Sequence, residues 1–163
     1  MPDSAHKPTS STAHVRIAGA ADTEVVARMF FELWPDGTLA QHREEAALIL
    51  AGTPPSPLPL VVFVVESDGK VIGFVEVGLR SHADGCDPRQ PVGFIEGWYV
   101  ELEHRGKGVG RGLMLAAEDW ARSQGCRELA SDTWIDQESS QRAHEALGFE
   151  VVDRCVHFKK ALR

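Results

Sequence analysis

The sequence has 163 residues, of which 43% are hydrophobic and 25% are charged, values typical of one soluble globular domain with its own core. Its formal net charge is −7, which argues against a nucleic-acid-binding protein and favours a cationic small substrate.

The first third of the chain predicts a strand followed by two helices. Residues 1–13 are small and polar without an apolar core, so we expect a disordered tail and no signal peptide. Residues 14–18 alternate between polar and apolar and predict a strand. Asp22 is placed to cap a helix that ends at the Pro-Asp-Gly of residues 35–37, and residues 39–52 predict a second helix.

The middle of the chain predicts a linker, a hairpin and a third long strand. Four prolines in residues 53–59 indicate a surface connection. Two β-branched runs in residues 60–80 flank Ser-Asp-Gly-Lys, which predicts a hairpin with Asp68 and Gly69 at its tip. Continuous apolarity in these runs indicates strands that are covered on both faces. Residues 92–101 predict the next strand.

The last third predicts a helix that buries Leu113 and ends near Gly125, a fifth strand over residues 127–134 and a helix over 137–147. Residues 149–162 predict a closing pair of strands. Three scattered cysteines without a C-x-x-C spacing argue against a disulfide framework or a zinc site, so we expect no metal. The longest apolar run is too short to span a membrane, and we expect a cytoplasmic protein.

The turn RGKGVGRG, residues 105–112, lies between the predicted strand and helix. Its glycines allow positive φ and close approach of a ligand, and the helix N-terminus offers unpaired N–H groups. With three cations, this arrangement predicts a phosphate or pyrophosphate site. It lacks the Ser or Thr of a P-loop and fits a dinucleotide-binding loop poorly. The residues expected to hold the anion are Arg105, Gly106, Lys107, Gly108, Val109, Gly110 and Arg111.

The spacing Arg105-x-x-Gly108-x-Gly110 resembles the R/Q-x-x-G-x-G/A acetyl-coenzyme A loop of the GNAT acetyltransferases. The fragments LWP, DGC, FIEG, ASDT and SQRAHEALGFE, in this order, resemble bacterial aminoglycoside 6′-N-acetyltransferases. The resemblance implies a single α/β domain over residues 14–163. Its fold would be a mixed, mostly antiparallel sheet of about seven strands, splayed in the middle, with about four helices on both faces.

The resemblance also implies where the donor, acetyl-CoA, binds. The backbone groups of Trp98, Tyr99 and Val100 would hold the pantetheine arm, and the Val100 N–H would polarise the acetyl carbonyl. Gln137 would bond the arm as well. His144 occupies the place of a tyrosine that many relatives use to protonate the leaving thiolate, so either His144 is that acid or the thiolate leaves without one.

Two carboxylates are candidates for binding the acceptor amine. Glu96 and Asp132 each lie in an otherwise apolar predicted strand, where a lone acid is costly unless it is paired or faces a binding site. The resemblance places both beside one site, where they would bind ammonium groups and accept the proton of the attacking amine. It adds Trp34, His82 and Asp153 as substrate contacts.

Three functions remain open at this point: an aminoglycoside 6′-N-acetyltransferase, an acetyltransferase for a polyamine, an amino-sugar metabolite or a protein N-terminus, and a catalytically idle coenzyme A sensor. The intact loop and both carboxylates argue against the sensor. We expect a homodimer, formed through the C-terminal strands as the resemblance implies, and no nucleic-acid or membrane partner.

Overall fold

The computed structural model describes residues 13–162, so most of the expected tail of residues 1–13 lies outside the described residues. It contains one five-stranded sheet in the order β1-β2-β3-β4-β5. All neighbouring strands are antiparallel except β4 and β5, which are parallel. The strands are β1 (His14–Ile17), β2 (Leu60–Ser67), β3 (Lys70–Arg80), β4 (Val92–Val100) and β5 (Leu129–Ser131).

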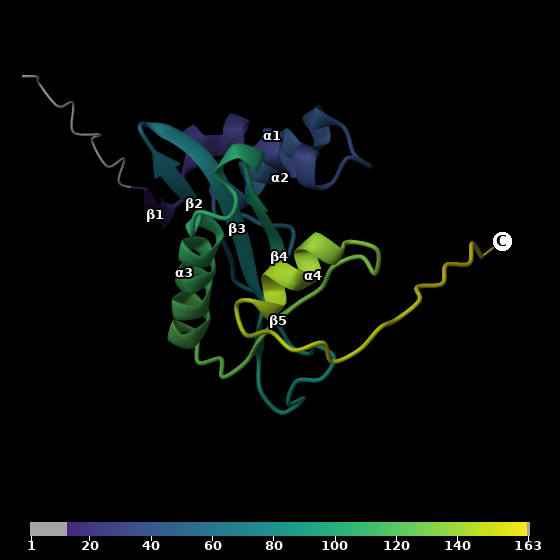
Figure 1. Cartoon of the computed structure of the whole chain (residues 1–163). Helices are drawn as coiled ribbons and strands as arrows, with labels where there is room; N and C mark the ends of the chain where they lie inside the picture. The colour runs from purple at the N-terminus through teal and green to yellow at the C-terminus, as the bar shows by residue number, and fades with distance from the viewer. Residues whose placement is uncertain (1–12, 163) are drawn as a thin grey trace, which may run out of the picture.

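Helices cover both faces of this sheet (Figure 1). On one face lie α1 (Thr23–Leu33) and α2 (Leu39–Leu50), and on the other lie α3 (Val109–Ser123) and α4 (Glu138–Glu145). Single turns of 3-10 helix precede α1 (Ala20–Asp22) and follow β4 (Leu102–His104). This is the mixed α/β architecture that the sequence predicts.

Strand β3 supplies side chains to the cores on both faces. Phe74 packs with Phe30 of α1, whereas its neighbour Val75 packs with Leu113 of α3, and all four side chains have no exposed surface. Successive strand residues point to opposite faces, so a strand that is covered on both faces is apolar at nearly every position. The continuous apolar run is therefore explained.

The hairpin between β2 and β3 also forms as predicted. Asp68 and Gly69 at its tip have φ of 51° and 73°. Two consecutive positive φ angles match the twist of the flanking strands, which is why Asp-Gly is favoured there. This turn fixes the register of the two central strands, which pair from Leu60 with Gly78 to Ser67 with Lys70.

The sheet opens between β4 and β5. These strands pair only from Gly93 with Leu129 to Ile95 with Ser131. Strand β4 nevertheless stays paired with β3 up to Val100. Beyond Ile95 and Ser131 the two strands are therefore unpaired, and we call this place the β4–β5 opening. It is the splayed sheet that the sequence predicts.

Three sequence predictions are wrong in detail. Strand β5 is three residues long and does not extend over residues 127–134. Residues 149–162 form no strand, and the sheet has five strands instead of about seven. The later part of this segment runs away from the rest of the chain toward the C-terminus (Figure 1), so it has no neighbouring strand to pair with. Asp22 does not cap α1 with its side chain, because its carboxylate accepts hydrogen bonds from Arg16 and from the Gly19 N–H.

Candidate active site

The turn between β4 and α3 presents the N-terminus of a long helix. Gly106 and Gly108 have φ of 70° and 84°, which side chains rarely adopt, and a Cβ at either would meet no atom within 4 Å. Gly108 precedes α3, whose first turn has no side-chain cap. Lys107 and Arg111 are exposed and, within residues 13–162, form no ion pair. The turn therefore offers free N–H groups and free cations to an anion.

Two other residues of this turn are already engaged by the protein. The Arg105 Nε donates to the Val100 carbonyl over 2.7 Å, and this bond ties the turn to the end of β4. A Cβ on Gly110 would lie 2.7 Å from the Trp98 ring. Gly110 is therefore needed for packing, because the indole of Trp98 occupies the space above it.

Strand β4 keeps a free backbone edge at the opening. The Glu101 N–H donates to the Ile72 carbonyl over 2.9 Å. Hydrogen-bonded and non-hydrogen-bonded pairs alternate in an antiparallel ladder, so Tyr99 bonds to β3, whereas the N–H groups of Trp98 and Val100 point away from it. They point to the side that β5 leaves unpaired. This edge can accept an extended, amide-containing ligand.

His144 reaches the same opening from α4. Its Nδ1 lies 2.8 Å from the Ser140 carbonyl and its Nε2 lies 2.9 Å from the Ser131 hydroxyl. The carbonyl can only accept, so Nδ1 carries the proton and Nε2 accepts from Ser131 in the neutral ring. The ring packs edge-on against Trp98 and Phe149. Gln137 lies exposed at the N-terminus of α4.

Tyr99, in contrast, faces the opposite side of the sheet. Its hydroxyl donates to Glu32 of α1, and burial together with this acid raises the pKa of Tyr99 to about 12. Its side chain packs with the α1–α2 core. The tyrosine of this chain is therefore in no position to replace His144, and only its backbone belongs to the edge of β4.

The two predicted carboxylates come directly after the last paired residues of β4 and β5. Ile95 and Ser131 are the last paired residues, so Glu96 and Asp132 are the next positions on the two strands. Glu96 lies at an irregularity in the ladder, because Glu76 pairs with Gly97 and Val77 pairs with Ile95. Asp132 is exposed. The register therefore puts Glu96 and Asp132 at neighbouring positions beside the β4–β5 opening.

Glu96 is not the lone acid that the sequence suggests. Arg80 of β3 binds it through two hydrogen bonds of 2.9 and 2.6 Å, and the guanidinium lies over the Phe94 ring. The side chain of Arg80 is 42% exposed and that of Glu96 is 28% exposed, so a cation in solution can still reach Glu96. Glu76, on the same strand as Arg80, is a further buried acid that sequence reasoning missed. Its sequence signal, one acid within an apolar run, is the same as that of Glu96.

The other predicted substrate contacts are Trp34, His82 and Asp153. The Trp34 indole covers Gly97, where an added Cβ would lie 2.5 Å from the ring. His82 is exposed in the β3–β4 loop, with its Nε2 3.6 Å from Asp84. Val152 contacts Gly85 of that loop, which brings the segment containing Asp153 close to it.

The profile of the Acetyltransferase (GNAT) family matches residues 23–149. The chain belongs to the GNAT acetyltransferase family. Among curated relatives, an aminoglycoside N(6′)-acetyltransferase type 1 from Klebsiella aerogenes is 41% identical over 148 residues, covering 91% of this chain and 96% of the relative. Another, from Stenotrophomonas maltophilia, is 39% identical and covers 94% and 96%.

Solved structures give the same family. AAC(6′)-Iy in complex with CoA is 32% identical with a TM-score of 0.86, covering 96% of this chain and 99% of that one. The same enzyme with the bisubstrate analogue CoA-S-monomethyl-acetylneamine is 33% identical with a TM-score of 0.83, covering 93% and 100%. The helix N-terminus, the cationic turn and the free edge of β4 fit acetyl-CoA, the cosubstrate of GNAT enzymes.

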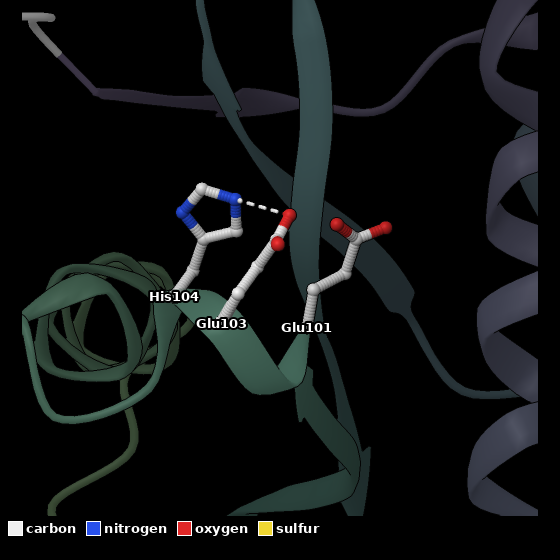
Figure 2. Close-up of side chains that lie close together, drawn as sticks. All are labelled: Glu101, Glu103 and His104. Carbon is white, nitrogen blue, oxygen red and sulfur yellow. Dashed lines mark ion pairs between the residues drawn. The ribbon is translucent and has the colours of Figure 1, made fainter.

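This GNAT chain offers one group of side chains with metal-ligand spacing in residues 13–162. The ligand atoms of Glu101, Glu103 and His104 lie within 4.8 Å of one another (Figure 2). Glu101 already pairs with Arg28 over 3.0 Å. His104 Nε2 lies 3.4 Å from Glu103, which is 79% exposed. Exposed acids of this kind are common at protein surfaces without an ion. In the same residues, no helix has the length and hydropathy of a membrane span.

Proposed function

We propose that the protein transfers the acetyl group of acetyl-CoA to the 6′-amino group of aminoglycosides and so confers resistance to them. The observation that carries this proposal is the placement of Glu96, Asp132 and Trp34 beside the β4–β5 opening. Acids and a flat aromatic ring are suited to a sugar that carries several ammonium groups. The relatives are named for the same reaction.

The donor half of the site would hold acetyl-CoA, which supplies an acyl group activated as a thioester. The first-turn N–H groups of α3, with Lys107 and Arg111, would bind its pyrophosphate. The free edge of β4 at Trp98 and Val100 would bind the pantetheine arm as an added strand, with Gln137 nearby. The Val100 N–H would donate to the acetyl carbonyl and stabilise the negative charge that develops there.

The acceptor half would orient the amine for direct attack in a ternary complex. Glu96 and Asp132 would bind ammonium groups of the substrate, and one of them would take the proton of the attacking amine, directly or through water. Trp34 would support a sugar ring, and His82 and Asp153 would contact its far end. Holding both substrates at one place removes most of the entropic cost of their encounter.

We assign the proton that the departing thiolate needs to His144 and Ser131 together. In the neutral ring the Nδ1 proton is held by the Ser140 carbonyl, and Nε2 faces the Ser131 hydroxyl. A proton on Nε2 would therefore leave through Ser131 Oγ, which would take it from the imidazolium and pass its own proton on. His144 also keeps Trp98 in place by packing against it.

Product analysis tests this function. The purified protein is incubated with acetyl-CoA and tobramycin, kanamycin A, spermidine or a peptide, and thiol release is measured. We expect turnover of both drugs, with the acetyl group on the 6′-nitrogen by NMR. Acetylation of the 3-amine, or turnover of spermidine alone, would contradict the assignment.

We also propose that the protein forms a homodimer in which each copy covers the C-terminal segment of the other. Val156, Phe158 and Leu162 are 76%, 94% and 90% exposed, although the alternation of residues 156–159 is that of a strand. A second copy would bury them and pair their backbone. A cytoplasmic location fits the need for acetyl-CoA and the three free thiols.

A further inference from the structure

Glu76 is an unpaired acid in the middle of the sheet. It is 6% exposed, and within the described residues no group donates a hydrogen bond to it. The fully buried, unpaired polar atoms of those residues are His42 Nδ1 and Trp98 Nε1, so the little surface that Glu76 keeps includes its carboxylate oxygens. An unpaired buried carboxylate is costly, and a protein keeps one where a ligand supplies the partner.

The side chain of Glu76 lies on the acceptor side of the sheet. It is two residues from Phe74, which packs against α1, and its cross-strand neighbour is Gly97. Gly97 has no side chain, and the Trp34 indole covers it. On the same face, Glu96 Oε1 lies 3.8 Å from the place that a Cβ on Gly78 would occupy.

The charges around Glu76 do not neutralise it. Burial, followed by the charges of Glu45 in α2 and Glu96 in β4, raises the pKa of Glu76 to about 8. The other charged or titratable groups of α1, α2, β3 and β4 with a printed partner are bound elsewhere. His42 bonds to the Trp34 carbonyl, Arg80 to Glu96 and Tyr99 to Glu32. Arg28 pairs with Glu101 and Arg43 with Glu24. Glu76 therefore holds a proton at neutral pH until a cation approaches.

We propose that Glu76 is a third acceptor-binding carboxylate, which receives an ammonium group of the polycationic substrate beside Trp34. Arg80 already binds Glu96 through two hydrogen bonds, whereas Glu76 has no partner in the described residues and can take an ammonium group as one. As the ammonium group binds, the carboxyl group gives up its proton to solvent and forms a charge-assisted hydrogen bond. The identity of this polycation rests on the proposed function.

The test compares Glu76→Gln with Glu44→Gln. Glutamine keeps the shape of a protonated glutamate and can give up no proton. Glu44 is exposed on α2 and forms no ion pair in residues 13–162, so its variant makes the same substitution outside the site. Calorimetric titrations of the CoA-saturated protein with tobramycin and with spermine, each in two buffers of different ionisation enthalpy, count the protons that accompany binding.

We expect Glu76→Gln to weaken tobramycin binding and raise its KM by about tenfold or more, with the KM of acetyl-CoA unchanged. Binding to this variant should release up to about one proton fewer than binding to the wild type or to Glu44→Gln. Equal affinities and equal proton counts for both polycations would overturn the proposal. Turnover of tobramycin by the wild type tests the proposed function separately, because spermine reports on Glu76 even if the drug is no substrate.

Discussion

The hydrogen bond between Ser131 and His144 joins β5 to α4 at the place where a thiolate would leave. If the two side chains pass one proton, each needs the other. We expect Ser131→Ala and His144→Phe each to lower kcat about ten- to a hundredfold, and the double variant to be no slower than the slower single one. Phenylalanine keeps the packing against Trp98. Steady-state kinetics measure kcat of the three variants. If the loss of kcat in the double variant equals the product of the two single losses, the residues act independently.

The burial of Glu76 also makes stability depend on pH. Its pKa is about 8 in the folded protein and 4.5 for an unperturbed glutamate, so between these values the folded state binds a proton that the unfolded state has lost. Stability from this group is present below about pH 4.5 and falls as pH rises through about 8.

Urea unfolding of the wild type and Glu76→Gln at pH 5, 6.5 and 8 measures this effect. The difference in the free energy of unfolding should shift in favour of the variant with rising pH, by at most about 1.4 kcal/mol per pH unit. Parallel curves for the two proteins would show that Glu76 is charged when folded.

The anion-binding role of the turn between β4 and α3 can be tested with a matched control, because α3 has a similar glycine near each end. Gly108 and Gly125 have φ of 84° and 85°, and a Cβ on either meets no atom within 4 Å. Gly108→Asp and Gly125→Asp therefore carry a similar backbone strain. Only the first puts a negative charge at the N–H groups of the helix. We expect calorimetry to show acetyl-CoA binding lost in Gly108→Asp and kept in Gly125→Asp, and equal affinities would contradict a pyrophosphate site there.

For the molecule as a whole, the exposed C-terminal segment predicts the state of assembly. Replacing Val156 and Phe158 with Asp should separate a dimer into monomers, because the buried face of the added strand would become charged. Size-exclusion chromatography with light scattering measures the mass of the wild type and the variant. A monomeric wild type would refute the dimer.

Sequence reasoning succeeded where the signal is local. The Asp68-Gly69 tip and the glycines of the β4–α3 turn are set by the backbone angles of the residues themselves. It failed for Glu76 and Arg80. The face of the sheet that Glu76 occupies and the pairing of Arg80 with Glu96 both depend on the register between β3 and β4.

The prediction of strands over residues 149–162 was wrong for a related reason. The pattern of residues 149–162 is that of strands, but a strand requires a neighbour, and the described chain provides none. The strand pattern singled out Glu96 and Asp132 as acids in apolar surroundings, and the family resemblance implied that both lie beside one site.

The two faces of β4 are relevant to how the substrate range of such a protein can change in evolution. The side chains of Trp98 and Ile95 face α3, whereas Tyr99 and the Trp34-covered Gly97 face α1. The proposed donor contacts use the backbone edge of β4 and the turn before α3, whereas Trp34, Glu76 and Glu96 lie on the α1 face of the sheet. Mutations around α1, α2 and the β3–β4 loop can alter which amine is admitted while the coenzyme A contacts are inherited intact. Selection by a new drug would therefore act on one layer of the molecule, and we expect natural variation in drug range to concentrate there.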